Sequence, residues 1–520
     1  MMFFGVHDVV LPNQQTVMKY KYLLPFLALL VAANAFAQKA GKLYHEQYRP
    51  QIHFSPKSGW MNDPNGMVYY KGVYHLFYQH YPDGIVWGPM HWGHATSKDM
   101  IHWKEQKIAL YPDKLGYIFS GSAVIDVNNT SGFGKNGKVP MVAIFTHHDP
   151  VGEKAGKDNF QNQSIAYSLD EGKTWTKYAG NPVLKNPGIK DFRDPKVYWY
   201  EPQHKWIMTL ATKDRITFYS SPNLKTWKKE SEFGEHLGAH GGVWECPDLF
   251  PMTLKGKQHW VLIVNINPGG PNGGSATQYF IGDFNGKTFT PMNENVKWAD
   301  FGPDEYAGIT WSNTGNRRIF LGWMSNWEYA NQVPASTWRS TMTIPRELGL
   351  KEVNGEVYLT STPAKELASI AIKSINVPTA ILANGRDVAS FIKMPSYYRL
   401  KLSAAKEDLF INLFNDAGES LVIGYNKKSD RYFIERDKSG KTDFNKNFSK
   451  LAYVPRFSGQ ETLDVDIVVD GTSVEMFADG GLSNLTSIFF AAKPYNHISI
   501  QTAKGSVVNK VSITPLKSIW

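Results

Sequence analysis

The stretch "SLDEGKTW", residues 168–175, is the clearest copy of a pattern that recurs along the N-terminal part of the chain. "SKDMIHW" ends at Trp103, "SPNLKTW" ends at Trp227, and "DFNGKTF" is a degraded copy that ends at Phe289. Each copy opens with a small or polar residue, has a turn-prone centre, and closes with an aromatic residue that starts a new apolar run. Their final residues lie 72, 52 and 62 positions apart, which suits small sheets of four strands better than single hairpins.

Repeats of this length, each forming one small sheet, indicate a β-propeller. Four copies over roughly 300 residues predict about five blades, and we assign them to residues 40–350. Within this region "MVYYKGVYHLFYQ" (67–79) reads as two strands joined at Lys71-Gly72, which is a tight hairpin signal. The aromatic content of 14% also favours β structure, because aromatic side chains fit a pleated, half-buried surface.

The pattern of the sequence changes after residue 345. "TPAKELASIAIKSI" (362–375) is consistent with a short helix or a linker, and we assign residues 351–370 to a linker. Segments such as "LDVDIVVDGTSVEMFADGG" (463–481) then alternate apolar and polar residues, with Asp470-Gly471 as a hairpin turn. Residues 371–520 are therefore predicted to form a β-sandwich, and the fold class of the whole chain is all-β.

Residues 1–37 have the features of a bacterial-type secretory signal peptide. Met18 is an alternative start, followed by Lys19, Lys21 and an apolar run that ends in Ala35-Phe36-Ala37. The run is too short to span a membrane. We therefore expect a secreted or periplasmic protein with no membrane span after cleavage. Because Cys246 is the only cysteine, no disulfide within the chain can contribute to stability.

Several classes of partner are disfavoured by the sequence. The net charge of +9 is mild for 520 residues, and basic runs with interleaved aromatic residues do not occur, so nucleic-acid binding is not expected. "THHDP" (146–150) places two histidines next to each other, but neighbours on a strand point to opposite faces. We predict neither a metal site nor a cofactor. The sequence leaves the oligomeric state open.

Three acidic motifs are the candidates for chemistry: Asp63 in "WMNDPNG", Asp194 in "FRDPK" and Glu245 in "WECPD". They fall in different repeat units, and in a propeller the inner strands of all blades converge on one axis. Asp63 and Asp194 directly precede proline, which restricts the backbone and hence the direction of each carboxylate. A pair of carboxylates that divides the roles of acid and nucleophile is the usual apparatus for cleaving a glycosidic bond.

Taken together, the motifs resemble glycoside hydrolase family 32, the levanases, exo-fructosidases and invertases. The similarity continues through "YHLFYQ", "WGPMHWGHATS", "FSGSAV", "GGVWECPDLF" and "LGWMSNW". The resemblance implies a five-bladed propeller followed by a β-sandwich, and retaining hydrolysis through a fructosyl-enzyme intermediate. It also implies a fructan or sucrose as substrate.

The resemblance assigns roles to individual residues. It makes Asp63 the nucleophile, Glu245 the general acid/base and Asp194 the stabiliser of the transition state. The positions that it implies for contacts with the sugar are Trp60, Asn62, Gln79, Trp87, Phe119, Ser120, Arg193, Tyr306 and Trp323. Arg193, which adjoins Asp194, is expected to keep that acid ionised, since a close opposite charge lowers the pKa of a carboxyl group.

The leading hypothesis is a retaining β-fructosidase that removes terminal fructose from levan or inulin and also cleaves sucrose. Two alternatives stay open at this point. The same site could transfer fructose to a sugar rather than to water, or the propeller could bind fructans without catalysis. The sequence does not decide between levan, inulin and sucrose, or between exo and endo action.

Overall fold

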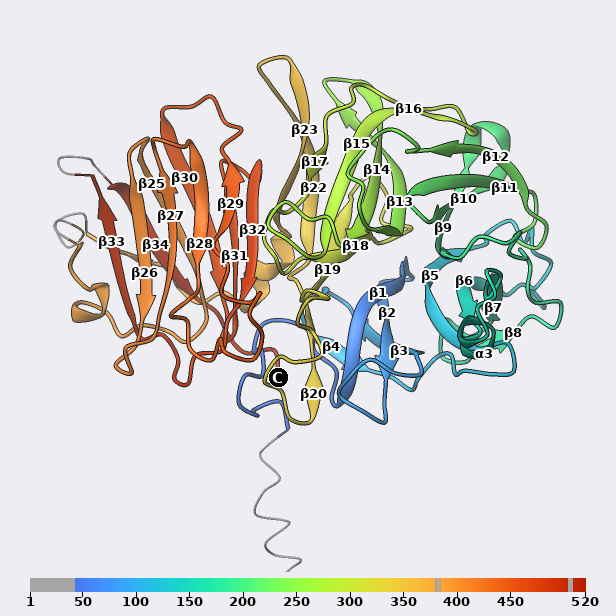
Figure 1. Ribbon diagram of the computed structural model, residues 1–520, viewed down its shortest axis with the longest axis horizontal. Coiled ribbons are helices and arrows are strands. Elements are labelled where there is room, and N and C mark those ends of the chain that lie inside the picture. Colours follow the sequence, from blue (N-terminus) through green and yellow to red (C-terminus); the bar gives the residue numbers. More distant parts are fainter. Residues whose placement is uncertain (1–42, 379–381, 383–384, 504–507) are drawn as a thin grey trace, which may run out of the picture. The chain divides into compact units, whose positions relative to one another are not determined.

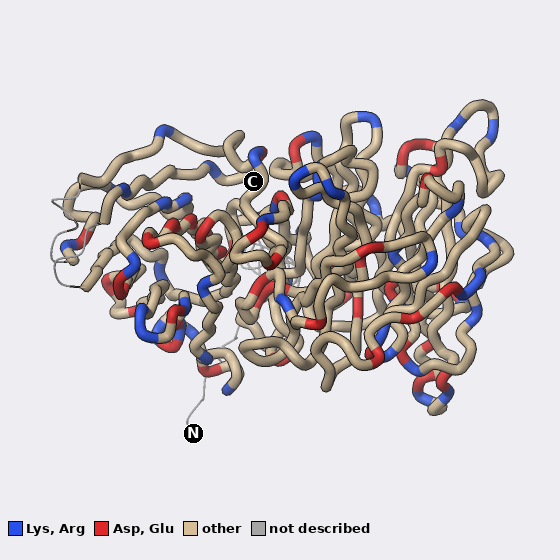
Figure 2. The backbone as a smooth tube through the Cα atoms, turned by 90° about the horizontal axis from the view of Figure 1, so that it is seen from above, with Lys and Arg blue, Asp and Glu red and all other residues tan. Residues whose placement is uncertain are grey.

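The computed structural model describes residues 43–378, 382, 385–503 and 508–520, and these residues are almost entirely β-structure (Figure 1). The predicted signal peptide lies outside the described residues. Within them, no helix is long and apolar enough to cross a membrane. Lys and Arg are interspersed with Asp and Glu along the described chain (Figure 2), in keeping with the mild net charge.

Five antiparallel sheets follow one another along the chain and form the blades of the predicted propeller. In every blade the strands pair in sequence order, so each sheet is a meander. Blade 1 contains β1 (Gly59–Tyr70), β2 (Val73–Tyr81), β3 (His91–Ser97) and β4 (Trp103–Glu105). Blade 2 contains β5 (Tyr117–Ile125), β6 (Met141–His148), β7 (Gln161–Ser168) and β8 (Thr176–Lys177). The short helix α3 (Pro150–Lys154) lies between β6 and β7.

The next two blades repeat the pattern. Blade 3 contains β9 (Phe192–Tyr200), β10 (Lys205–Thr212), β11 (Arg215–Ser221) and β12 (Lys228–Phe233). Blade 4 contains β13 (Val243–Leu254), β14 (Lys257–Asn267), β15 (Ala276–Phe284) and β16 (Phe289–Pro291), and β17 (Lys297–Trp298) also pairs with β15.

Blade 5 completes the propeller and reaches beyond the boundary drawn from the sequence. It contains β18 (Tyr306–Thr310), β19 (Ile319–Met324), β22 (Arg346–Val353) and β23 (Glu356–Pro363), with β21 (Thr341–Met342) beside β19. The segment 351–370 is therefore not a free linker. It holds the end of β22, all of β23, and a 3-10 helix, Lys365–Ile370.

Each recurring sequence pattern forms the turn between the third and fourth strands of a blade, and the reason lies in its third residue. Asp99 accepts hydrogen bonds from the backbone N–H groups of Ile101 and His102. Asn223 and Asn285 accept equivalent bonds in blades 3 and 4, whereas Asp170 in blade 2 accepts from the N–H of Thr174, four residues ahead, at 2.9 Å. A short Asp or Asn side chain that caps backbone N–H groups two and three residues ahead stabilises a tight turn. The aromatic residue then begins, or directly precedes, the fourth strand.

The two ends of the propeller sequence are joined by backbone hydrogen bonds. The short strand β20 (Trp338–Arg339), which follows β19, pairs in parallel with the start of β1. Gly59 N–H donates to the Thr337 carbonyl at 2.9 Å. Farther along β1, Tyr69 N–H donates to the Ser312 carbonyl at 3.0 Å. These bonds close the ring of blades between the last blade and the first.

The C-terminal part is a β-sandwich of two antiparallel sheets, as predicted. One sheet has the order β24-β34-β25-β30-β31-β32 and the other β29-β28-β27-β26-β33. The strands of the first are β24 (Ile375–Asn376), β25 (Tyr398–Ala405), β30 (Thr462–Val469), β31 (Ser473–Ala478), β32 (Ser483–Ile488) and β34 (Val508–Pro515). Those of the second are β26 (Leu409–Phe414), β27 (Ser420–Asn426), β28 (Arg431–Glu435), β29 (Ala452–Pro455) and β33 (His497–Thr502). Their inward-facing residues share one apolar core.

A buried network of charges joins the sandwich to the propeller. Arg346 of β22 donates to Asp300 at 2.8 Å and to Glu475 of β31 at 3.0 Å. His53, just before β1, bonds to Asp470 at 2.7 Å and to the other oxygen of Glu475 at 2.8 Å. The side chains are at most 1% exposed. Buried charges of this kind are tolerated only when every one is paired, so removal of one partner leaves a costly isolated charge.

This network makes stability depend on pH through His53. Burial by itself would lower the pKa of His53, but the hydrogen bonds with Asp470 and Glu475 outweigh it and raise the pKa to about 9. A group whose pKa is higher when folded stabilises the protein fully below its unfolded pKa, near 6.5. We therefore expect the free energy of unfolding to fall by about 3 kcal/mol as pH rises from 6.5 through 9.

The measurement is urea unfolding, followed by tryptophan fluorescence, at several values between pH 6 and pH 10. His53→Gln should be less stable at pH 6 and should show a much shallower decline above pH 6.5. His236→Gln, at an exposed histidine, is the matched control and should behave like the wild type. A decline of the same size in His53→Gln and the wild type would contradict the assignment.

Candidate active site

The three predicted acids come from the first strands of three blades: Asp63 from β1, Asp194 from β9 and Glu245 from β13. Cys246 Sγ lies 3.6 Å from Asp63 Oδ2 and 3.6 Å from Asp194 Oδ2, which places the two aspartates on either side of one thiol. Arg193 links Asp194 to Glu245. Residues far apart in sequence thus meet at one place.

The first strand of every blade is interrupted at the level of the site. In each blade two consecutive residues of this strand lie opposite one residue of the second strand, which is a β-bulge. The two-residue steps are Asn62-Asp63, Phe119-Ser120, Asp194-Pro195, Cys246-Pro247 and Ala307-Gly308. A bulge redirects side chains that would otherwise alternate regularly between the two faces of the sheet.

Some of these steps use backbone conformations that side chains rarely adopt. Asp194, Cys246 and Ala307 have φ values of +64°, +41° and +54°. Pro195 and Pro247 follow two of them, and a proline has no N–H group to leave unpaired where the ladder breaks. Strained residues of this type are found mainly at functional sites, where the surrounding structure holds them.

Asp63 is held by hydrogen bonds to both of its oxygens. Ser120 Oγ donates to Oδ2 at 2.6 Å, and Asn62 Nδ2 donates to Oδ1 at 2.9 Å. Trp60 Nε1 in turn donates to the amide oxygen of Asn62 at 2.7 Å, which fixes the direction of that amide. Burial raises the pKa of Asp63, the bond from Ser120 opposes this, the charge of Glu245 raises the pKa again, and Asn62 lowers it. The donors thus offset part of the cost of keeping this carboxylate ionised.

Asp194 is the most enclosed of the three acids, with a side chain only 5% exposed. Its Oδ2 accepts from the backbone N–H of Cys246 at 3.0 Å. Burial raises its pKa to about 7, although the charge of Arg193 opposes the rise. The charge of Arg193 does lower this pKa, as expected, but burial outweighs it, so the net shift is upward. The reason is geometric, because the closest contact of Arg193 with Asp194 is 4.0 Å, while its other contacts are shorter.

Those shorter contacts of Arg193 hold Glu245. The guanidinium donates twice to Glu245 Oε1, at 2.9 and 3.2 Å, and once to Asp191 at 2.6 Å. Tyr306 donates its hydroxyl to the other oxygen of Glu245. Burial, reinforced by the charge of Glu245, raises the pKa of Tyr306, so the phenol stays a donor. Both oxygens of Glu245 therefore face donors, and its side chain is 19% exposed.

The thiol between the aspartates is not a nucleophile. Burial raises the pKa of Cys246 far above its ordinary value, and the charges of Asp194, Asp63 and Glu245 raise it further. A thiol that stays protonated is a weak nucleophile. It can serve only as a weak hydrogen-bond donor between the two carboxylates.

Aromatic side chains form two groups, one around Trp60 and one at Phe119, which adjoins Ser120 in the sequence. Trp60 packs against Trp323 and Trp327, at 6.1 and 5.9 Å between ring centroids, and Trp323 lies 6.5 Å from the Tyr306 ring. Elsewhere Trp87 meets Phe119 edge-on at 6.1 Å, and Trp87 is 39% exposed. Such rings can stack on the apolar face of a sugar.

The sequence-predicted positions are therefore distributed as follows. Five of them contact the acids or each other directly: Trp60, Asn62, Ser120, Arg193 and Tyr306. Gln79 lies on β2, opposite the Asn62-Asp63 step. Trp323 is fully buried and lies behind Trp60 and Tyr306.

The sequence reasoning missed several supporting residues: Asp191, Thr146, His148 and Trp327. Asp191 pairs with Arg193, and Thr146 accepts from the backbone N–H of Asp194 at 3.1 Å. The ring of His148 stacks on Phe119 at 4.1 Å. Trp327 belongs to the "LGWMSNW" motif, whose second tryptophan was an available signal.

In the described residues, no group of three or more His, Cys, Asp or Glu side chains has the geometry of a metal site. The site is instead a set of carboxylates from separate blades, held by a guanidinium, hydroxyls and amides and bordered by aromatic rings.

Fold and site together define an enzyme of the glycoside hydrolase class. Two family models match the chain: the glycosyl hydrolases family 32 N-terminal domain at residues 53–363 and the family 32 C-terminal domain at 366–516. The chain belongs to glycosyl hydrolases family 32.

Similar proteins include a levanase of Bacillus subtilis, 45% identical over 96% of this chain and 75% of the relative. An extracellular exo-inulinase of Aspergillus ficuum is 41% identical over 92% of this chain and 96% of the relative. Among solved structures, exo-inulinase from Aspergillus awamori is 38% identical with a TM-score of 0.85, covering 92% of this chain and all of that one. The predicted family and the predicted fold, a five-bladed propeller followed by a β-sandwich, are confirmed.

Proposed function

We propose that the protein is a retaining β-fructosidase that hydrolyses terminal fructose from fructans, and also cleaves sucrose. The observation that carries the proposal is the meeting of Asp63, Asp194 and Glu245 from three blades, with Arg193 and Tyr306 both donating to Glu245. The relatives named levanase, exo-inulinase and invertase support the substrate class.

In the first step Asp63 attacks the anomeric carbon of the terminal fructosyl unit. Glu245 gives its proton to the glycosidic oxygen, so that the leaving group departs as an alcohol and an ester bond joins fructose to Asp63. Arg193 and Tyr306 are donors, and donors favour the carboxylate that Glu245 becomes after it has lost the proton. Their placement therefore assists the transfer of the proton to the leaving oxygen.

In the second step Glu245 acts as a base. It takes a proton from water, the resulting hydroxide adds to the anomeric carbon, and the ester bond to Asp63 breaks. Two inversions at the same carbon retain its configuration. We assign Asp194, buried beside the site, to hydrogen bonds with fructose hydroxyls that strengthen in the transition state. The remaining contacts with the sugar are proposed for Trp60, Asn62, Gln79, Trp87, Phe119, Ser120, Arg193, Tyr306 and Trp323.

We further propose that residues 1–37 direct secretion, so that the enzyme acts outside the cytoplasm on a polymer too large to be taken up. The similarity to an extracellular exo-inulinase of Aspergillus ficuum supports this. We place the domain boundary between β23 and the 3-10 helix at Lys365, where the two family models also meet.

Variants of the two reacting carboxylates test the mechanism. Glu245→Gln should lower kcat by about 10²–10⁴-fold because general acid–base catalysis is lost, and Asp63→Asn should lower it at least as much. Both proteins should unfold at nearly the wild-type temperature. Release of fructose from sucrose is the assay, and Asp283→Asn, at an exposed acid of blade 4, is the control. Turnover within tenfold of wild type in either variant would refute the roles.

The pH profile of kcat/KM tests the contact between Ser120 and Asp63. The Ser120 bond lowers the pKa of Asp63, so Ser120→Ala should raise that pKa. Because attack needs ionised Asp63, activity should then be lost at a higher pH as the solution is made more acidic. A bond to a charged group is worth about 1.5–3 kcal/mol, so a shift of the acid limb by about one to two units is expected.

Ser164→Ala is the matched control, since that buried serine of the same blade bonds to His147 and not to an acid. The control should leave the acid limb in place. An unchanged acid limb in Ser120→Ala as well would mean that the limb reports another group.

Product profiles on levan, inulin and sucrose, run in parallel, test the reaction itself. An exo-acting hydrolase should release fructose as the sole early product from both polymers, with no intermediate oligosaccharides. Chromatography at high sucrose concentration is the second measurement. Oligosaccharides longer than the donor as the main products would show transfer rather than hydrolysis.

A further inference from the structure

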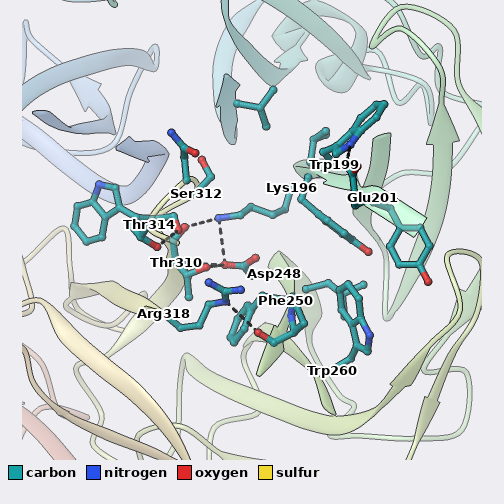
Figure 3. A pocket seen from close by; sticks show the side chains of 18 of the residues that line it. Lys196, Trp199, Glu201, Asp248, Phe250, Trp260, Thr310, Ser312, Thr314 and Arg318 are labelled. Carbon is teal, nitrogen blue, oxygen red and sulfur yellow. Dashed lines mark hydrogen bonds and ion pairs between the residues drawn. The ribbon is translucent and has the colours of Figure 1, made fainter. Parts of the chain in front are cut away.

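A second cavity lies at the other ends of the strands that carry the acids. It has a volume of about 680 Å³, within the range of pockets that hold small ligands. On β9 the acid is at position 194 and the cavity is lined by residues 196–200. On β13 the acid is at position 245 and the cavity is lined by residues 248–251. β5 and the segment after β18 supply the remaining inner walls (Figure 3).

Aromatic rings form much of the lining of this cavity. They are Tyr198, Trp199, Tyr200, Trp206, Phe250, Trp260, Phe284 and Trp311. Tyr198 and Trp260, from neighbouring blades, lie 5.6 Å apart between ring centroids. Trp199 and Trp260 stand on the same side of the cavity in Figure 3. Rings combined with a few placed polar groups are typical of sites for small organic ligands, and ring faces suit the C–H face of a sugar.

One polar group in the lining has no partner. The hydroxyl of Tyr198 is buried, and it makes no hydrogen bond with any residue in the described part of the chain. A buried hydroxyl without a partner costs free energy, and nearly all such groups in folded proteins are satisfied. This oxygen is covered in the free protein, so a ligand hydroxyl in the cavity would complete the bond once the Tyr198 ring turns toward it.

The charged groups of the lining are already paired. Lys196 reaches across the cavity to the Thr310 carbonyl at 2.5 Å and to Asp248 at 3.2 Å (Figure 3). Thr310 Oγ1 also donates to Asp248 at 2.7 Å. Arg318 donates to three backbone carbonyls, of Pro251, Gly315 and Arg317. Glu201, the other charged side chain of the lining, accepts a hydrogen bond from Trp199 Nε1. Because the two cations and two carboxylates balance, the cavity favours a neutral ligand over an ionic one.

We propose that this cavity is a second, non-catalytic site that binds a neutral oligosaccharide, with Tyr198 and Trp199 as its principal contacts. It goes beyond the hydrolysis proposed above and does not depend on it. Lys196 lies between the two sites, because it also lines the small void beneath Asp194, Ser120 and Cys246. Lys196, which pairs with Asp248, thus contributes to the wall between the reacting acids and the second site.

The test is titration calorimetry with an inulin-derived fructose trisaccharide and, separately, with maltotriose. The protein is Asp63→Asn, which prevents turnover during the titration. We expect a binding event whose affinity falls about tenfold when Tyr198→Phe is added, since one hydrogen bond is lost. Trp199→Ala should weaken the same event by tenfold or more. In the otherwise unmutated protein, Tyr198→Phe should leave kcat unchanged.

The thermal midpoint separates binding from a structural effect. Because the Tyr198 hydroxyl has no partner, Tyr198→Phe should not lower the unfolding temperature of the free protein. Tyr219→Phe is the control: it lies on β11 of the same blade, is buried, and does not line the cavity. The proposal is overturned if neither sugar shows a binding event that responds to both Tyr198→Phe and Trp199→Ala, or if Tyr219→Phe has the same effect.

Discussion

One backbone constraint, a two-residue interruption of the innermost strand, recurs at the same level in all five blades. A regular strand would present alternate residues to the axis and send the others into the blade. The interruption changes that alternation at Asp63, Ser120, Asp194 and Cys246, and so directs their polar groups toward one another. The prolines that follow Asp63, Asp194 and Cys246 fit the break because they have no N–H group to pair. The position of the carboxylates is therefore a property of the main chain more than of side-chain packing.

Buried charged residues that are all paired with one another also join the propeller to the sandwich. One buried charge network joins the propeller and the sandwich, and it contains Arg346, Glu475, Asp300 and His53. Arg436 of the sandwich, which pairs with Asp304 of the propeller, belongs to another. Removal of one partner by mutation would leave the other charge buried and unpaired, at a cost of about 3–5 kcal/mol. The sandwich thus acts as a structural partner of blade 5, the blade that supplies Tyr306 to the site.

Much of the architecture could be predicted from the sequence because the information is local. The recurring turn depends on one Asp or Asn that caps backbone N–H groups a few residues ahead. The repeat can therefore be recognised in the amino-acid sequence itself. Blade 5 lacks that pattern: its outer strands meet at "VNGEV" (353–357), and its last strand was assigned to a linker. The proline after two of the acids was a valid sign of restricted backbone, but it did not reveal the break in the ladder.

The contacts of Arg193 could not be predicted in the same way. Its neighbour in sequence is Asp194, yet its guanidinium extends toward Glu245 on the next blade. Sequence adjacency says little about pairing when the backbone at position 194 is left-handed, at φ +64°. The raised pKa of Asp194 follows from burial, which depends on how three blades enclose it. Properties of this kind arise only from the assembled ring.

The pairing of β1 with β20 has a consequence for the order in which the chain is synthesised and the site is completed. The strand that bears Asp63 is made early in synthesis. The residues that pair with the start of this strand, Thr337 and Trp338, are made near the end of the propeller. A growing chain cannot complete the site until the last blade is available. Hydrolytic competence is thereby tied to completion of the whole ring, and a truncated or partly made chain would lack it.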